Sequence, residues 1–146
     1  MPANDEFSFL PAQMAAAGLT GPLPSVRRAD ISLPDGRTLS GLAWGDSAPE
    51  VTLLHGAGLN AHTWDTTVLH LGIPALALDL AGHGDSSWRD DAAYSADTLA
   101  PDVIRALDAM TDRPQLLVGH SLGGLTAAAV AATSLMTSLS GGQAAR

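Results

Sequence analysis

The chain alternates short apolar runs with longer segments of mixed polarity. Three short runs are rich in Val, Leu and Ala, and each leads into a polar, glycine-containing loop: residues 51–54, 74–78 and 115–118. The segments that follow these runs are predicted helices: residues 62–71, 95–110 and 122–132. The helix over 95–110 is indicated by its apolar spacing, and the helix over 122–132 by a face of small residues. Strands that alternate with helices in this way are typical of a parallel sheet covered on both faces. We therefore predict an α/β fold.

A β-hairpin is predicted ahead of this alternation. Residues 26–33 and 37–44 are two partly alternating runs, and the tripeptide Pro34-Asp35-Gly36 separates them. Proline fixes its own φ and glycine tolerates positive φ, so this tripeptide favours a tight turn. The sheet is thus expected to be mostly parallel and to be entered through an antiparallel hairpin.

The two ends of the chain lack a clear period. Residues 1–24 are rich in Ala, Gly and Pro, which indicates an N-terminal extension with a short helix near residues 12–17. After Thr133 the composition turns to Ser, Thr, Gly and Gln, so residues 134–146 are predicted to form an irregular C-terminal tail. The α/β domain is expected to occupy residues 25–133 and to be partial.

Composition and charge exclude several classes of function. The 146 residues are 46% hydrophobic, which fits one globular domain with a core. A formal net charge of -8 repels phosphate backbones and anionic membrane surfaces, so neither nucleic acid nor membrane is an expected partner. Cysteine is absent and the acidic opening MPANDEF lacks the basic region of a secretory signal, which favours a cytoplasmic location.

No cofactor or metal is indicated either. The five histidines lack the H-x-x-x-H spacing with an intervening Glu, and neither the G-x-G-x-x-G nor the P-loop pattern occurs. The weakly polar run over residues 116–136 is dominated by small residues and contains His120, which makes it a poor membrane span.

A G-x-S-x-G pattern follows the third apolar run. It reads Gly119-His120-Ser121-Leu122-Gly123, between a predicted strand and a predicted helix. A serine in that position can occupy a sharp, strained turn that lifts its hydroxyl clear of both elements. Ser121 is therefore the candidate nucleophile, and the alternative is a plain turn from strand to loop.

Two backbone N–H groups are candidates to stabilise an oxyanion beside that serine. Leu122 begins the next helix, and the first N–H groups of a helix lack intrahelical acceptors and carry the positive end of its dipole. The loop His55-Gly56-Ala57-Gly58 follows the first central strand, and its glycines let the Ala57 N–H point at the same spot. Leu122 and Ala57 are thus the predicted oxyanion donors.

Taken together, these motifs resemble the α/β-hydrolase superfamily, in the group of small esterases, lactonases, C–C hydrolases and cofactor-free perhydrolases. The resemblance covers about residues 25–132 and rests on the hairpin, HGAG followed by Trp64, DLAGHGDSS at residues 79–87 and GHSLGG. It implies Ser121 as nucleophile, Ala57 and Leu122 as oxyanion donors, and a small-molecule substrate with an ester-like acyl bond. A serine at this turn differs from the aspartate of haloalkane dehalogenases and epoxide hydrolases.

The catalytic acid and histidine have no counterpart after the nucleophile. A serine hydroxyl needs a histidine to take its proton and a carboxylate to orient that histidine, and in this family both follow the serine. Residues 122–146 contain no Asp, Glu or His. We therefore expect the N-terminal part of an α/β-hydrolase fold, with the C-terminal strands and lid missing.

Two consequences are left open at this point. The nucleophile strand is expected at an exposed sheet edge, where a separate C-terminal half or a second copy of the chain could pair with it. The alternative function is a non-catalytic fragment or interaction partner derived from such a hydrolase. His83, with Asp79 and Asp85 nearby, is the internal candidate for a substitute base, against a structural role in its loop; His55 and His120 are expected to be structural.

Overall fold

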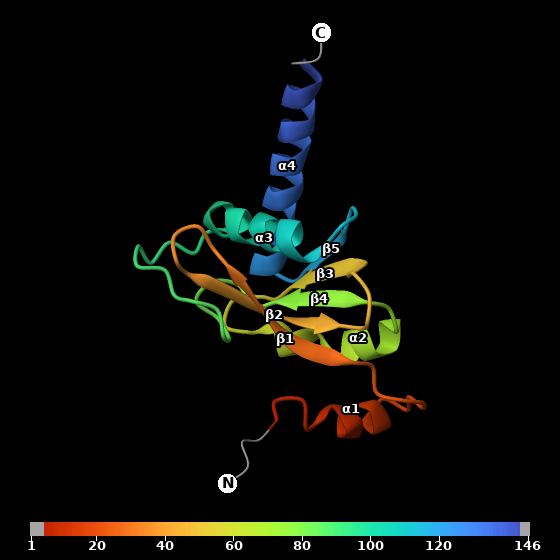
Figure 1. The fold of residues 1–146 in the computed structure, drawn as a ribbon. Coiled ribbons are helices and arrows are strands. Elements are labelled where there is room, and N and C mark those ends of the chain that lie inside the picture. The colour runs from red at the N-terminus through yellow and green to blue at the C-terminus, as the bar shows by residue number, and fades with distance from the viewer. Residues whose placement is uncertain (1–4, 144–146) are drawn as a thin grey trace.

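A computed structural model describes residues 5–143 and places one mixed sheet between two groups of helices (Figure 1). Five strands form this sheet in the spatial order β1-β2-β4-β3-β5. Their bounds are β1 Val26–Ser32, β2 Thr38–Trp44, β3 Val51–Leu54, β4 Ala75–Leu78 and β5 Leu116–Gly119. Each predicted apolar run is therefore a strand, and β5 lies at one edge of the sheet, as expected.

The strand directions confirm the predicted hairpin and the mostly parallel sheet. β1 pairs antiparallel with β2, and β2 pairs antiparallel with β4. β3 pairs parallel with β4 and with β5, so Leu53 lies opposite both Ala77 and Val118. All four residues of β3 are buried, which explains why exposed polar residues do not alternate with apolar ones in its sequence.

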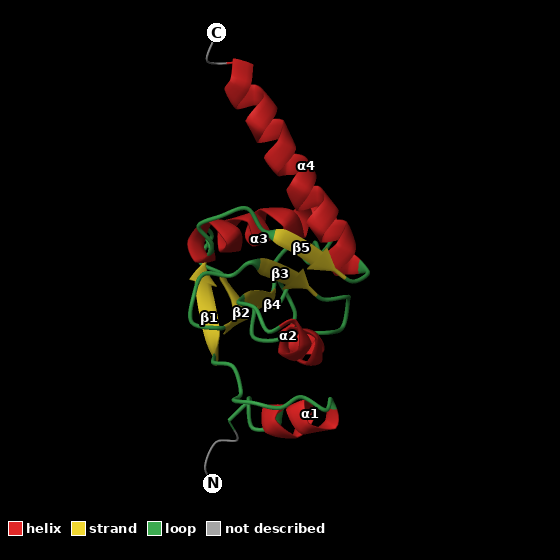
Figure 2. Cartoon of the chain, turned by 90° about the vertical axis from the view of Figure 1, so that its right-hand side faces the viewer, coloured by secondary structure: helices red, strands yellow, loops and turns green. Residues whose placement is uncertain are grey.

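Helices cover both faces of the sheet (Figure 2). Their bounds are α1 Leu10–Ala16, the 3-10 helix η1 Ala61–Trp64, α2 Asp65–Leu71, α3 Ala96–Met110 and α4 Leu122–Gln143. α3 and α4 lie on one face, while α1 and α2 lie on the other. The predicted helices at 62–71 and 95–110 are thus confirmed within a few residues of their expected bounds, and the one at 122–132 is confirmed at its start but extends to Gln143.

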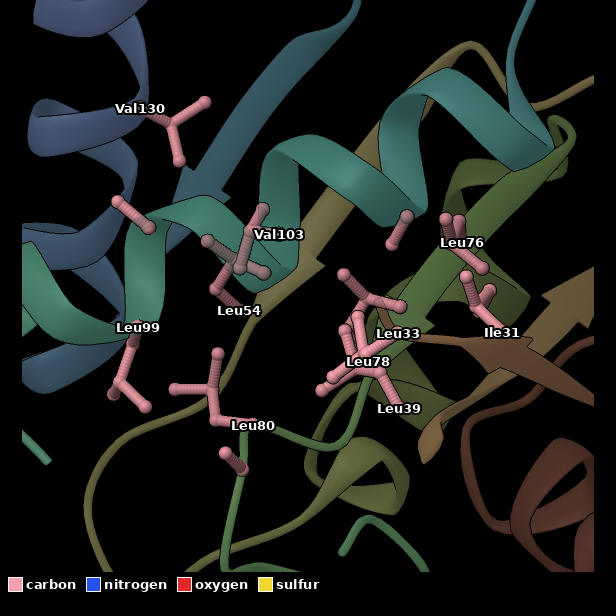
Figure 3. Close-up of a cluster of buried hydrophobic side chains, with 13 residues drawn as sticks. Ile31, Leu33, Leu39, Leu54, Leu76, Leu78, Leu80, Leu99, Val103 and Val130 are labelled. Atoms are coloured by element: carbon pink, nitrogen blue, oxygen red, sulfur yellow. The ribbon is translucent and has the colours of Figure 1, made fainter. Parts of the chain in front are cut away.

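Two hydrophobic clusters form because successive strand residues point to opposite faces. Leu54, Leu76 and Leu78 point toward α3, where they pack with Leu99 and Val103 (Figure 3). On the other face, residues of β2, β3 and β4 pack with α1 and α2: Leu42, Leu53, Ala75, Ala77, Leu10 and Val68. The sheet is therefore buried on both sides along β4 and β3.

The N-terminal extension is folded onto the domain over its described part. Leu10 of α1 is fully buried in the cluster on the α2 face, and Phe7 and Met14 pack against that cluster. Glu6 accepts hydrogen bonds from Arg28 of β1 at 2.6 and 3.3 Å. The short helix expected near residues 12–17 is present at 10–16, and residues 1–4 lie outside the described part.

The irregular tail predicted for residues 134–146 is wrong over its described part, because α4 continues to Gln143. Hydroxyl groups in this segment donate to the carbonyl four residues earlier, as Ser134 does to Val130 and Ser138 does to Ser134, both at 3.1 Å. Such bonds satisfy polar side chains within a helix. Residues 144–146 lie outside the described part, and none of the described helices is long and apolar enough to cross a membrane.

A buried carboxylate connects the loops at one end of the sheet. Asp79 follows β4, is 1% exposed, and accepts hydrogen bonds from Arg28 Nη1 at 2.7 Å, the Ala61 N–H at 2.6 Å and the Asp85 N–H at 3.1 Å. A Cβ on Gly84 would collide with this carboxylate. Asp79 thus holds the start of η1, the 79–87 loop and β1 in fixed relation.

Replacing Asp79 with Asn is expected to lower the free energy of unfolding by about 3 kcal/mol, because it leaves Arg28 without its buried partner. An amide also has a single acceptor oxygen, so the Ala61 and Asp85 N–H groups compete for it. Urea denaturation followed by circular dichroism measures the loss.

Asp85→Asn is the matched control for that measurement. The Asp85 side chain is 66% exposed and lies 3.5 Å from Arg28 Nε, so its loss is expected to change stability by less than about 0.5 kcal/mol. Equal losses in the two variants would contradict the role given to Asp79.

Candidate active site

Ser121 lies in the sharp turn between β5 and α4. Its φ is +53°, and among the described non-glycine residues it shares positive φ with Ala92. This conformation costs a non-glycine residue on the order of 1–3 kcal/mol and persists where the surroundings impose it. Ser121 is exposed, so the turn presents its hydroxyl to solvent.

Close backbone packing imposes this turn. A Cβ on Gly123 would overlap the Leu54 carbonyl oxygen and would lie 2.6 Å from the carbonyl oxygen of His55. A Cβ on Gly119 would overlap the backbone of Gly123. The two glycines of the G-x-S-x-G pattern therefore let the start of α4 lie directly against the end of β3, which bends the chain at Ser121.

The start of α4 offers an unpaired donor. The Gly123 N–H donates to His120 O at 2.9 Å and the Leu125 N–H donates to Ser121 O at 3.1 Å. The Leu122 N–H, in contrast, has no hydrogen-bond acceptor among the residues that the structure describes. It lies at the positive end of a 22-residue helix, where negative charge is stabilised.

The loop after β3 lies beside this turn. The His120 N–H donates to Leu54 O at 3.0 Å, and a Cβ on Gly56 would lie 2.7 Å from His120 Nδ1. Ala57 is exposed in this loop, and its N–H also lacks an acceptor within the described part of the chain. The fold therefore brings the two predicted donor segments and the candidate nucleophile to the same end of the sheet.

Two histidines near the site, His55 and His83, are engaged in structural hydrogen bonds. His83 Nε2 accepts from the Gly58 N–H at 3.1 Å, and its Nδ1 lies 3.0 Å from Ala81 O. The fully buried His55 has Nδ1 at 2.8 Å from Gly56 O, and its Nε2 accepts from the Leu80 N–H at 3.0 Å. Burial lowers the pKa of His55 below its ordinary value of 6.5. This geometry favours the structural role for His83 over that of a substitute base.

Asp79 and Asp85, the carboxylates considered with His83, contact Arg28 instead. The sequence pattern did not indicate Arg28, whose partners lie 22 and 51 residues away along the chain. The described residues contain no group of three His, Cys, Asp or Glu side chains placed to hold a metal ion.

Known proteins are similar to this chain in sequence and in fold. A model of the "Alpha/beta hydrolase family" matches residues 53–145. The esterase Rv0045c of Mycobacterium tuberculosis is 50% identical over 132 residues, which are 88% of this chain and 41% of that protein. Protein phosphatase methylesterase 1 of Homo sapiens is 35% identical over 104 residues, 66% of this chain and 27% of that protein.

Solved structures give the same result. A crystal structure of the Rv0045c esterase superposes with a TM-score of 0.82 and 45% identity, over 91% of this chain and 46% of that chain. The thioesterase domain from the curacin biosynthetic pathway superposes with a TM-score of 0.66 and 29% identity, over 75% of this chain and 40% of that chain. The chain thus spans less than half the length of these relatives.

Substitution of Gly123 tests the close packing that shapes the turn. Gly123→Ala is expected to lower the free energy of unfolding by about 3 kcal/mol, because the added methyl group overlaps rigid backbone of β3. Gly124→Ala is the control, since its Cβ would lie 3.2 Å from Gly119 O and alanine favours the helix by about 1 kcal/mol. Urea denaturation should show little change for Gly124→Ala; a similar loss in both variants would contradict the packing argument.

Stability should fall on mild acidification because of His55. The folded state holds the pKa of His55 below 6.5, so the unfolded chain binds a proton first. The contribution of neutral His55 to the free energy of unfolding is complete above pH 6.5 and is lost as the pH falls below it. The limiting slope is about 1.4 kcal/mol per pH unit. Urea denaturation from about pH 7.5 to about pH 5.5 measures this slope.

His55→Gln should flatten the slope, since glutamine does not titrate yet can still accept from the Leu80 N–H. His70→Gln is the control, because exposed His70 contacts the Thr66 carbonyl of its own helix, and should keep the slope. Identical slopes in the wild type and His55→Gln would contradict the assignment.

Proposed function

The chain belongs to the alpha/beta hydrolase family, and we propose that it carries the nucleophile half of a serine hydrolase that cleaves carboxylic ester or related acyl bonds. The observation that carries this proposal is the strained backbone of Ser121, with φ +53°, between β5 and α4. A non-glycine residue holds this conformation where surrounding structure imposes it, and at such a turn the serine hydroxyl is presented to a substrate.

The proposed chemistry is acyl transfer in two steps. Ser121 Oγ adds to the substrate carbonyl carbon while its proton passes to a base, and the leaving alcohol takes that proton as the C–O bond breaks. Water then hydrolyses the acyl-enzyme. The N–H groups of Ala57 and Leu122 donate to the oxyanion that forms in each step, because both lack acceptors in the described structure.

The relatives support an ester as substrate. Rv0045c is named an esterase and the human relative a methylesterase, and the chain is 50% and 35% identical to them over the matched regions. The proposed substrate class for this chain is therefore a small molecule with an ester-like bond. Ser121, His120 and Ala57 are all exposed, so a substrate can reach the serine from solvent.

We propose that the base and its orienting carboxylate come from outside residues 1–146. His55 and His83 use both ring nitrogens in structural hydrogen bonds, and residues 122–146 contain no Asp, Glu or His. β5 is an edge strand, and its Leu116 is 66% exposed. This edge suits a further strand, from a separate C-terminal half or from a second copy of the chain.

The non-catalytic alternative rests on the same observation, that residues 122–146 contain no Asp, Glu or His. A serine in an oxyanion site without its base retains weak reactivity, whereas an inert binding module retains none. Reactivity at Ser121 therefore separates the two functions.

The expected result is covalent labelling of Ser121 by a fluorophosphonate, slow in this chain alone because the base is missing. Intact-mass analysis and peptide mapping measure the label. Ser121→Ala should abolish it, while Ser47→Ala, an exposed serine at the opposite end of the sheet, should not change it.

A chimera tests the complete reaction. This chain replaces the matched region of the Rv0045c esterase, and hydrolysis of a p-nitrophenyl ester is followed. We expect turnover that Ser121→Ala lowers by about 10⁴-fold or more. A folded chimera without turnover, combined with no labelling of the chain, would favour the non-catalytic function.

A further inference from the structure

The loop that carries the Ala57 N–H lies at the surface. Residues 57–60 are exposed and lie outside any helix or strand. Within the loop, the Leu59 N–H donates to Gly56 O at 3.1 Å, which closes one turn. An exposed turn of this kind would sample several orientations unless other groups fixed its peptide planes.

Two histidines fix those planes, one on each side of Ala57. His55 lies 2.8 Å from Gly56 O through Nδ1, and His83 accepts from the Gly58 N–H through Nε2 at 3.1 Å. The first bond holds the Gly56–Ala57 peptide and the second holds the Ala57–Gly58 peptide. In a trans peptide the C=O and N–H point in opposite directions, so fixing Gly56 O also aims the Ala57 N–H.

The hydrogen bonds determine which ring nitrogen carries the proton. His55 Nε2 accepts from the Leu80 N–H and His83 Nε2 accepts from the Gly58 N–H, so both Nε2 atoms are unprotonated. Each Nδ1–H then donates to a carbonyl, Gly56 O for His55 and Ala81 O for His83. Both rings are neutral in this arrangement.

The two rings also support each other. Their centroids lie 4.9 Å apart with the planes inclined by 61°, an edge-to-face contact. His83 is anchored in the 79–87 loop, whose first residue, Asp79, also accepts from the Ala61 N–H. The 79–87 loop therefore holds the loop after β3 at both of its ends.

We infer that His83 is a positioning residue for the oxyanion donor Ala57, acting together with His55. This inference rests on the proposed function, because it assigns to His83 the alignment of a catalytic N–H group. It assigns a function to the hydrogen bond between Gly58 and His83, which are 25 positions apart in the sequence. His83 touches neither Ser121 nor a reacting atom in this role.

The test compares two substitutions of His83 in the full chain. His83→Phe keeps a ring against His55 but removes the acceptor, whereas His83→Gln supplies a side-chain carbonyl oxygen that can accept from Gly58. Amide exchange and chemical shifts from ¹H–¹⁵N NMR report on Gly58 and Ala57, and fluorophosphonate labelling reports on Ser121. His70→Gln, an exposed histidine of α2, is the control.

In His83→Phe we expect exchange of the Gly58 amide to rise about tenfold and labelling of Ser121 to slow about tenfold, with Tm within about 2 °C of the wild type. His83→Gln should restore both values, and His70→Gln should change neither. The wild-type ¹⁵N spectrum should show the Nδ1–H tautomer for both His55 and His83.

An unchanged Gly58 amide in His83→Phe, or equal slowing of the labelling in the Phe and Gln variants, would overturn the inference. The two proposals fail separately. If Ser121 is never labelled while the Gly58 amide responds as expected, the proposed function fails and His83 keeps its place only as a support of the loop.

Discussion

The end of the sheet that carries the site depends on the buried carboxylate of Asp79. It receives the Arg28 guanidinium and two backbone N–H groups, while its own backbone N–H donates to Ser40 O of β2 at 2.9 Å. A buried charge with fewer partners would be strongly destabilising. Because these partners come from β1, η1 and the 79–87 loop, one side chain orders segments that are distant in sequence.

Asp79 affects the candidate site indirectly, through the two loops that it holds. By holding the 79–87 loop, Asp79 places His83 where it can accept from Gly58, and by holding Ala61 it fixes the far end of the loop that contains Ala57. The other wall of the site is fixed by the contact between Gly123 and the end of β3. The N–H groups of Ala57 and Leu122, the proposed oxyanion donors, therefore lie in segments that are fixed by backbone packing and a small polar network.

Much of this arrangement could be predicted from the sequence because its signals are local. The three apolar runs predicted their strands, the Pro34-Asp35-Gly36 turn predicted the hairpin, and the G-x-S-x-G pattern predicted a turn that the structure shows with positive φ at Ser121. Each signal is a few residues long. The family resemblance then gave the order in which these pieces assemble.

The contacts that hold the pieces together were beyond such prediction, since they join residues far apart. Nothing in the run around Arg28 indicates that it reaches Glu6 and Asp79, and nothing around His83 indicates that it binds Gly58, which lies 25 residues earlier. The tail after Thr133 was mispredicted because of contacts that are local, within the helix itself. Its serines and threonines are poor helix formers by composition, yet their hydroxyls bond back to the carbonyls of the same helix.

The two kinds of catalytic group in the proposed mechanism, oxyanion donor and general base, differ in what positions them. An oxyanion donor is a backbone N–H, so its position is set wherever the neighbouring chain is packed, and here that packing is formed by β3, β4, β5 and the start of α4. A general base is a side chain, and the proposal brings it to Ser121 from outside these elements, because His55 and His83 use both ring nitrogens to hold the loops. In the proposed serine hydrolase the described residues thus supply the backbone part of the site, and the exposed edge of β5 is where a further strand can pair with the sheet.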